Sequence, residues 1–176
     1  MEATGFAVAI MAAGKGTRLK SKRPKVLHEV GGRALLLHVI AAAQTLVPAG
    51  DIYCIIGHEA DKVRSAVEPT GVHFVLQEVQ RGTGHAMQIL KSSFELSGEP
   101  IPRHLLVLSG DVPLIKPETL ASLRALHLAE RAAMTILTAV PPDPTGYGRV
   151  LRVAPNSPEV TADEDSATPA DALRRG

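Results

Sequence analysis

The residues best suited to chemistry in this 176-residue chain form a glycine-rich, basic stretch near its start. The segment 12–18 reads AAGKGTR and directly follows the apolar run 6–11. Small residues let a backbone approach a ligand closely, and successive N–H groups in such a turn can bind an anion. Between Lys15 and Lys25 there are six basic residues and no acidic residue. An N–H cradle beside Arg and Lys side chains would bind a polyphosphate.

The same stretch leaves other interpretations open. It is not a Walker A loop, because no G-x-x-x-x-G-K-[ST] is present. It is not the dinucleotide fingerprint either, because Leu19 stands where the third glycine would be. Taken alone, it would also suit a solvated basic turn, and KSKRPK at 20–25 would suit a nuclear-import patch.

A carboxylate forms the second candidate. Asp111 follows Gly110 at the end of the apolar run 104–108. A carboxylate at the carboxyl end of a strand can hold a hard cation, and Mg²⁺ usually takes one or two carboxylates together with substrate phosphate oxygens. An Asp in an ordinary turn or helix cap would show the same local sequence. Ser109 is not a nucleophile elbow, because no G-x-S-x-G surrounds it.

The third candidate is the segment 77–86, which reads QEVQRGTGHA. Gln77 offers both a hydrogen-bond donor and an acceptor, so it could read the edge of a base. Glycines bracket Thr83, which is predicted as a helix N-cap, so the stretch also suits a simple helix start. His85 is predicted to be structural or solvent-facing rather than catalytic.

The fourth candidate is the segment 143–149, DPTGYGR. The backbone N–H of Gly148 could contact a second substrate there, although a turn between strands would give the same pattern. The histidines show no metal-ligand spacing. The single cysteine, Cys54, excludes a disulfide within the chain and is predicted to be an inert core residue.

The composition is that of a globular protein. The chain is 45% hydrophobic and 21% charged, which argues against a wholly disordered or fibrous chain. A net charge of +1 gives no argument for nucleic acid or an anionic membrane, and 3% aromatic residues do not favour a single-strand stacking platform. No apolar stretch reaches the ~18 residues of a spanning helix, and no basic leader precedes the first apolar run. We therefore expect a cytoplasmic protein that does not bind membranes.

The apolar pattern predicts alternating strands and helices. Strands are expected at 6–11, 51–57, 72–76, 104–108 and 133–140, and helices at 34–46, 59–67, 83–94 and from Pro117 through Leu126. Strands that read as continuous apolar runs are buried on both faces, as in a parallel sheet covered by helices. The pattern predicts an α/β fold with an open, mostly parallel sheet and helices on both faces. Ligands bind beyond the carboxyl ends of such strands, where all four candidate stretches lie.

The sequence predicts one folded domain and a tail. Residues 1–153 are expected to form an α/β domain that is incomplete at its C-terminal side. Residues 154–176 hold three prolines and five acidic residues with almost no large apolar residue. They are predicted to be loop or disordered.

Together, the four stretches resemble the uridylyltransferase (pyrophosphorylase) domain of bacterial N-acetylglucosamine-1-phosphate uridyltransferase. The resemblance runs from about Phe6 to Arg152 and is carried by MAAGKGTRLKSKRPKVLHEVGGRALLLHVI, LQEVQRGTGHAM, LSGDVPL and DPTGYGRV. The first and third of these motifs occur in many nucleotidyltransferases. QRGTGHA and DPTGYGR are much more particular to this family.

The resemblance implies a Rossmann-like nucleotidyltransferase. Its reaction converts UTP and N-acetylglucosamine 1-phosphate, with Mg²⁺, into pyrophosphate and UDP-N-acetylglucosamine, a peptidoglycan precursor. The implied roles are nucleotide contacts at Ala12, Ala13, Gly14 and Gly110, catalysis by Arg18 on the triphosphate and by Lys25 on phosphate, uracil recognition by Gln77, Gly82 and Thr83, a Mg²⁺ ligand at Asp111, and a sugar contact at Gly148.

The sequence also departs from the family pattern. The family domain continues well beyond this length, with a second metal ligand and an asparagine for the N-acetyl group that have no counterpart here. Glu164 matches the family's sugar-binding glutamate only if a small deletion is allowed. The family's acetyltransferase β-helix has no counterpart in this sequence, so acetyl transfer and the trimer that the β-helix builds are not expected. We therefore expect a truncated chain or a fragment that binds nucleotide weakly with little or no turnover.

Two alternatives remain open at this point. The glycine-rich loop and the Gly-Asp motif do not by themselves fix the base or the acceptor, so another sugar-phosphate or a molybdopterin nucleotidyltransferase would also fit. A catalytically inactive nucleotide-binding fragment is the other alternative. Nucleic-acid binding is disfavoured, because the basic cluster is also the predicted phosphate loop.

Overall fold

The computed structural model describes residues 5–16, 19, 21, 23–152 and 160–163. The chain divides into two compact units, Met1–Glu130 and Arg131–Gly176, which are described separately. The boundary that the sequence places at 153/154 stays a prediction.

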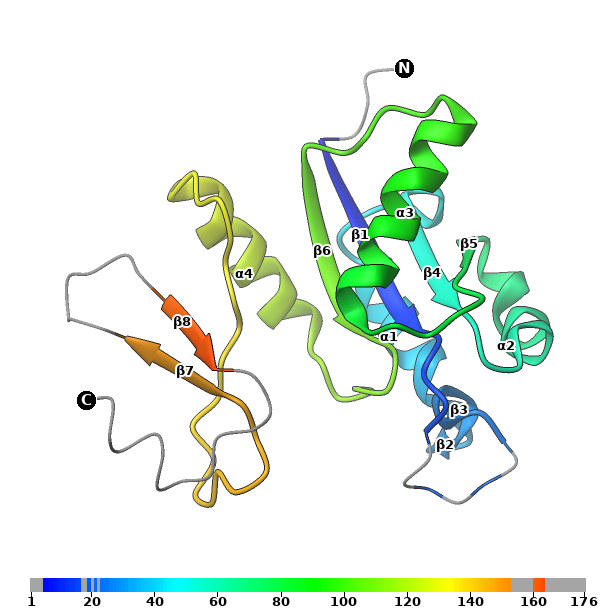
Figure 1. The fold of residues 1–176 in the computed structure, drawn as a ribbon, viewed down its shortest axis with the longest axis horizontal. Coiled ribbons are helices and arrows are strands. Elements are labelled where there is room, and N and C mark those ends of the chain that lie inside the picture. Colours follow the sequence, from blue (N-terminus) through cyan, green and yellow to red (C-terminus); the bar gives the residue numbers. More distant parts are fainter. Residues whose placement is uncertain (1–4, 17–18, 20, 22, 153–159, 164–176) are drawn as a thin grey trace. The chain divides into compact units, whose positions relative to one another are not determined.

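A four-stranded parallel sheet forms the centre of the first unit (Figure 1). Its strands are β1 (Phe6–Ala12), β4 (Ile52–Ile56), β5 (His73–Leu76) and β6 (His104–Ser109), in the order β5-β4-β1-β6. The chain runs outward from β1 through β4 to β5 and then returns to place β6 on the other side of β1. The strand order therefore reverses beside β1, and open α/β sheets bind ligands at such points, beyond the carboxyl ends of the strands.

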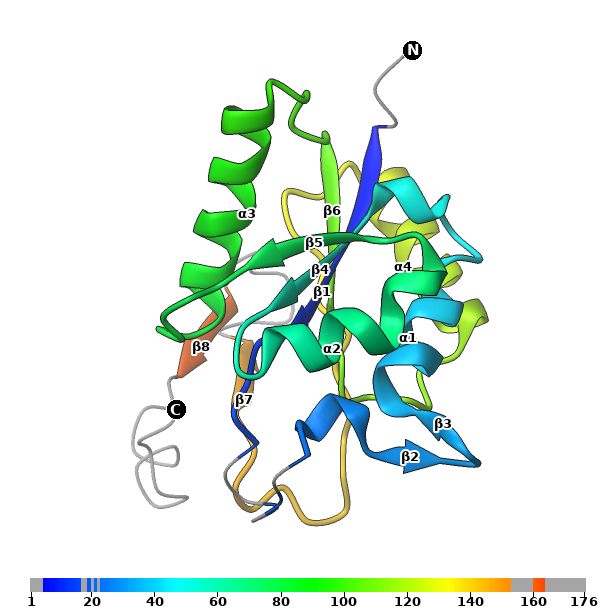
Figure 2. The ribbon, with the colours of Figure 1, turned by 90° about the vertical axis from the view of Figure 1, so that its right-hand side faces the viewer.

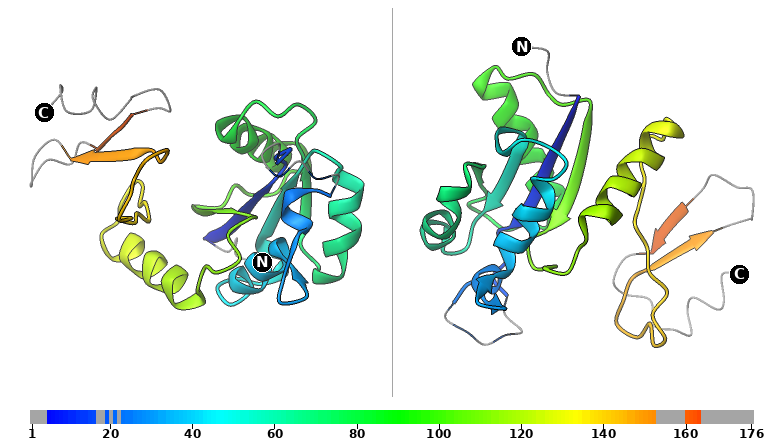
Figure 3. Two further views of the ribbon diagram at one scale, coloured as in Figure 1. Left: turned by 90° about the horizontal axis from the view of Figure 1, so that it is seen from below. Right: turned by 180° about the vertical axis from the view of Figure 1, so that it is seen from behind.

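Helices cover both faces of this sheet, as the sequence predicts. Helices α1 (Leu35–Ala43) and α2 (Ala60–Val67) lie on one face, and α3 (Thr83–Ser97) lies on the other (Figure 2; left view of Figure 3). Helix α4 (Pro117–Ala129) follows β6 and starts at a proline, whose missing N–H costs nothing in the first turn. Its Arg124 donates a 3.0 Å hydrogen bond to the carbonyl oxygen of Leu46.

Short elements complete the first unit. They are the 3-10 turns η2 (Lys25–Leu27), η3 (Ala49–Asp51) and η4 (Glu68–Thr70), and the hairpin of β2 (Glu29–Val30) and β3 (Arg33–Ala34). The apolar periodicity does not reveal elements of two or three residues, because a repeat of buried positions cannot be recognised over so few residues.

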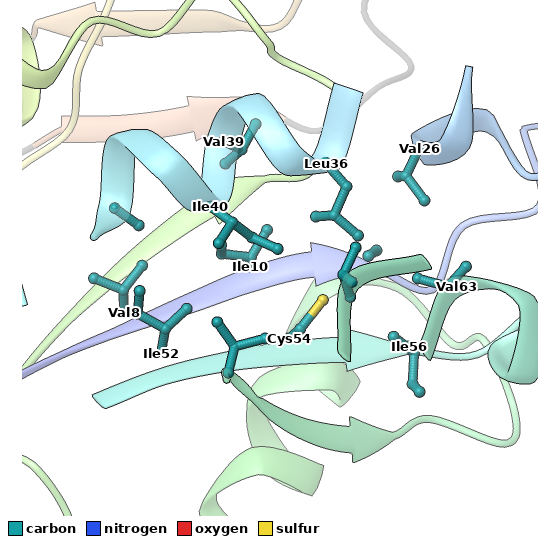
Figure 4. Close-up of a cluster of buried hydrophobic side chains, with 14 of the residues drawn as sticks. Val8, Ile10, Val26, Leu36, Val39, Ile40, Ile52, Cys54, Ile56 and Val63 are labelled. Atoms are coloured by element: carbon teal, nitrogen blue, oxygen red, sulfur yellow. The ribbon is translucent and has the colours of Figure 1, made fainter. Parts of the chain in front are cut away.

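The alternating side chains of the sheet build two apolar clusters. Val8 and Ile10 of β1 pack with Ile40 of α1 on one face (Figure 4), whereas Ala9 packs with Leu90 of α3 on the other. Each fully buried branched side chain stabilises the fold by roughly 1.5–3 kcal/mol. β1 is thus buried on both faces, which explains its continuous apolar sequence. Cys54 lies in the first cluster and is a buried free thiol, as predicted.

β6 differs from the expected pattern. It lies at one edge of the sheet, and its burial alternates along the strand. Leu105 and Val107 are 38% and 42% exposed. The buried residues of α3 pack against β1, β4 and β5, so this face of β6 does not share their burial.

Among the described residues of the second unit, one antiparallel pair of strands forms. β7 (Arg149–Arg152) pairs with β8 (Val160–Asp163), and β8 forms within the stretch that the sequence predicts as loop. The strand predicted at 133–140 is wrong: the structure has no regular element there. An apolar run forms a strand only within a ladder of backbone hydrogen bonds, and none of the described sheets includes this one, in which Val140 is 99% exposed. Within the described ranges of both units, no helix combines the length and apolar character needed to span a bilayer.

Candidate active site

The glycine-rich loop after β1 begins the site. Gly16 has a φ of +59°, which favours glycine, and a Cβ built there would lie 2.8 Å from the Cβ of Lys25. Gly16 therefore lets the loop lie directly against Lys25. The loop is held at its start by the N–H of His58, which donates to the carbonyl oxygen of Ala13 at 3.3 Å.

The backbone of this loop keeps unused donors. In the described parts of the chain, no group accepts a hydrogen bond from the N–H of Gly14, Lys15 or Gly16. Gly14 and Lys15 are exposed, so water can satisfy these donors in the absence of a ligand. Free N–H groups on consecutive residues are what an anion cradle requires.

Lys25 and Asp111 form the charged part of the site. The ammonium of Lys25, at the start of η2, pairs with Oδ2 of Asp111, just beyond β6. The hydroxyl of Ser109 donates to the other carboxylate oxygen, Oδ1, at 2.9 Å. Both oxygens of the carboxylate are therefore held, one by a charge and one by a hydroxyl.

These contacts set the protonation of Asp111. Partial burial alone would raise the pKa of its carboxyl group, but hydrogen bonds from Lys25 and Ser109, together with the positive charge of Lys25, outweigh burial. The pKa of Asp111 therefore lies below its ordinary value. At neutral pH the side chain is a carboxylate, the form that a cation binds.

A buried amide forms the third part. Gln77 follows β5 and is only 3% exposed. Its Nε2 lies 3.2 Å from the carbonyl oxygen of Gly82 and 3.1 Å from Nδ1 of His85. Gly82, at φ +90°, is the N-cap of α3, and Thr83 is the first helical residue. The prediction of Thr83 as N-cap is wrong by one residue, because glycine adopts the positive φ that this helix start requires.

One cavity of about 560 Å³ joins the three parts. This volume is within the usual range for small-molecule sites, roughly 300–1,000 Å³. It is lined by the following predicted site residues: Ala12, Ala13, Gly14, Lys25, Gln77, Gly82, Thr83 and Asp111.

Four further residues were predicted for the site, of which the structure describes Gly110 and Gly148. Gly110 does not line the cavity; it is buried, and its N–H donates to the carbonyl oxygen of Met11 at 2.9 Å. Gly148 belongs to the second unit, and the predicted sugar contact stays a prediction. Arg18 and Glu164 lie outside the described residues.

Sequence reasoning missed three residues that shape this site. Gly16 lets the loop lie against Lys25, and Ser109 donates a hydrogen bond to Asp111. His85 lies within hydrogen-bonding distance of the Gln77 amide. The spacing S-x-D was a usable signal for Ser109, because a hydroxyl two residues before a carboxylate can bond to it locally. The contact between His85 and Gln77 depends on how α3 meets the end of β5, which no local pattern reveals.

Comparison with known proteins agrees with this geometry. Residues 8–167 match the family model of the MobA-like NTP transferase domain. The chain belongs to this family. A curated relative, the bifunctional protein GlmU of Koribacter versatilis, is 57% identical over 147 residues, covering 84% of this chain and 30% of that protein. The resemblance that the sequence motifs indicate is thus confirmed. The chain spans about a third of the length of the curated relatives it matches.

Two solved structures share the fold of this NTP transferase domain. Mannose-1-phosphate geranyltransferase from Thermus thermophilus has a TM-score of 0.69 and 23% identity, covering 97% of this chain and 53% of that one. Rv0371C from Mycobacterium tuberculosis H37Rv, solved in complex with manganese, has a TM-score of 0.54 and 24% identity, covering 72% and 61% of the two chains. These likenesses confirm the predicted Rossmann-like α/β fold.

Proposed function

We propose that this NTP transferase domain transfers a uridylyl group from UTP to N-acetylglucosamine 1-phosphate, which yields UDP-N-acetylglucosamine and pyrophosphate. The proposal rests on one observation above all. Unused backbone donors, a lysine, a carboxylate and a buried amide line a single cavity in a chain 57% identical to a GlmU protein. The first three suit a triphosphate and its counter-cation, and the amide suits a base.

The chemistry asks little of the protein beyond position and charge. An oxygen of the sugar phosphate attacks the α-phosphorus of UTP in line. The bond from this phosphorus to the oxygen that joins it to the β-phosphorus breaks, and pyrophosphate leaves. The attacking phosphate is already anionic, so no general base is needed. The loop donors of Gly14, Lys15 and Gly16 would bind phosphate oxygens, and Lys25 would offset the charge that develops on them. Arg18 is proposed to act on the triphosphate as well.

A divalent cation fits Asp111 in one specific manner. Among the described residues, no group of three or more possible metal ligands gathers. The described residues therefore do not offer enough ligands to hold a cation by protein atoms alone. A single carboxylate plus substrate phosphate oxygens is, however, a common way for proteins to hold Mg²⁺. When bound at Asp111, Mg²⁺ would supply further charge neutralisation to the leaving pyrophosphate.

The ion pair between Lys25 and Asp111 has a consequence for this proposal. The ammonium and a divalent cation both require the same carboxylate. A cation that takes Oδ2 of Asp111 displaces Lys25, and this movement frees the ammonium for a phosphate oxygen. In the ligand-free protein, Lys25 neutralises the charge of the Asp111 carboxylate. In the complex, it would neutralise charge on the substrate phosphates.

Ligand preference tests the proposed function. Thermal shift of the chain with Mg²⁺ and UTP, CTP, GTP or dTTP should give the largest stabilisation with UTP. At equal concentration, the ligand that binds the folded state most tightly stabilises it most. Pyrophosphate release is then followed with UTP and either N-acetylglucosamine 1-phosphate or glucose 1-phosphate. A preference for GTP would refute the uridylyl assignment and favour a nucleotidyltransferase for another base. UTP binding without pyrophosphate release would instead indicate a nucleotide-binding module.

A further inference from the structure

We infer that His85 is a positioning residue that turns the Gln77 amide into a pure hydrogen-bond acceptor, so that the site selects uracil over cytosine. This inference rests on the proposed function, since it concerns how the same site reads its base. The observation that carries it is the pair of contacts made by one nitrogen of Gln77. The amide lies against the start of α3, where both of its partners are found.

The orientation of the amide follows from its partners. A backbone carbonyl can only accept a hydrogen bond, so the Gln77 atom 3.2 Å from the Gly82 oxygen must be the NH₂ group. One of its two hydrogens is used there. The second points to Nδ1 of His85 at 3.1 Å, and this ring nitrogen must then accept, which places the imidazole proton on Nε2.

With both hydrogens used, the amide has no donor left to offer a ligand. What remains is Oε1, to which no group in the described chain donates a hydrogen bond. Gln77 lines the cavity and is otherwise buried, so the free acceptor belongs to the site. Among the described residues, Oε1 is not one of the buried side-chain atoms left without a partner, so water can reach it in the ligand-free protein, and a ligand with a matching donor would take the place of that water.

This arrangement distinguishes two pyrimidines. N3 of uracil carries a hydrogen and donates, whereas N3 of cytosine carries a lone pair and accepts. In the same pose, Oε1 would bond to uracil and repel cytosine. Without the acceptor at His85, only the bond to Gly82 would hold the amide in this orientation. The amide could then rotate to present an N–H to cytosine, and discrimination would fall. His85 does not touch the base in this scheme, but it determines what Gln77 presents.

Dissociation constants of the 176-residue chain for UTP and CTP, measured by calorimetry with Mg²⁺, test the inference. His85→Ala should lower the preference for UTP over CTP by about 3- to 10-fold, the effect of one neutral hydrogen bond, mainly through tighter CTP binding. Binding of inorganic tripolyphosphate should stay unchanged. His85→Asn, whose Oδ1 can take the place of Nδ1, should restore the preference. Should the alanine variant fail to fold, His85→Gln replaces it, because its amide reaches the place of Nε2 instead.

A measurement on the unmodified protein gives an independent check. The triphosphate of 3-methyluridine lacks the N3 hydrogen, and it should bind at least about 10-fold more weakly than UTP. Equal binding of the two would overturn the inference, as would an alanine variant with the unmodified protein's UTP preference. A protein that shows no preference for UTP over CTP at all would contradict the proposed function itself.

Discussion

Replacing Lys25 by methionine is expected to change the affinities for a divalent cation and for a nucleotide in opposite directions. The lysine neutralises Asp111, so removing it frees a carboxylate oxygen for a cation. The same lysine is proposed to bind phosphate, so a triphosphate loses a partner. A residue with only a structural role would lower both affinities together.

The size of the effect follows from exposure. The side chains of Lys25 and Asp111 are 42% and 24% exposed, so solvent screens the pair and it contributes about 0.2–1 kcal/mol. Manganese alone should then bind up to about 5-fold more tightly to Lys25→Met. UTP without metal should bind about 10-fold more weakly, the lower end for a charge-assisted contact. Protonation cannot explain the first change, because even an unperturbed Asp has a pKa of about 3.9 and is ionised at neutral pH.

Electron paramagnetic resonance of free Mn²⁺ gives the first affinity, and calorimetry with UTP gives the second. Lys91→Met is the matched control, because it also removes one positive charge and one exposed ion pair, with Glu95 in α3. Neither affinity should change in this control. If Lys25→Met weakens or leaves unchanged the binding of manganese, the lysine does not compete for Asp111 and the exchange of partners is refuted.

Three further predictions concern stability and reactivity. Gly110→Ala places a Cβ 2.9 Å from the backbone oxygen of Met11, so urea unfolding should show a loss of about 1–3 kcal/mol, whereas Gly84→Ala, which meets nothing within 4 Å, should show none. Since the pKa of Asp111 is lowered, its contribution to stability is present above the unfolded pKa and is lost as pH falls through the folded one. The urea midpoint of Asp111→Asn should therefore lie below that of the unmodified protein at neutral pH and approach it below about pH 4. Burial raises the pKa of Cys54 to about 12, so a thiol reagent at mildly alkaline pH should label it only after unfolding.

The central elements of the fold could be predicted because their signals are local. β1 and β4 read as unbroken apolar runs, since a strand covered on both faces has no polar side. The start of α4 was equally clear, because proline within a helix is favoured in the first turn, where Pro117 lies. The alternation of strands and helices then predicts a parallel sheet with its ligand site at one edge.

The segment 133–140 marks the limit of that reasoning. Its residues are mostly apolar, like those of β4, but a strand also needs a regular ladder of backbone hydrogen bonds, and no sheet in the described part of the chain includes this stretch. Hydropathy records which side chains avoid water. It does not record which backbone lies beside a given segment. The same apolar pattern therefore predicted β4 correctly and a strand at 133–140 wrongly.

The sequence by itself determined which chemical groups the site contains: the free donors of the loop after β1, Lys25, Asp111 and Gln77. Only the tertiary structure decided how they are paired, with the Lys25 ammonium on the Asp111 carboxylate and both hydrogens of the Gln77 amide already used. The physical reason is that the sequence gives the chemical groups of each side chain, whereas the neighbouring residues decide which of its hydrogen-bond donors, acceptors and charges stay available to a ligand. Those neighbours are brought together when β1, β5 and β6 end at the same edge of one sheet.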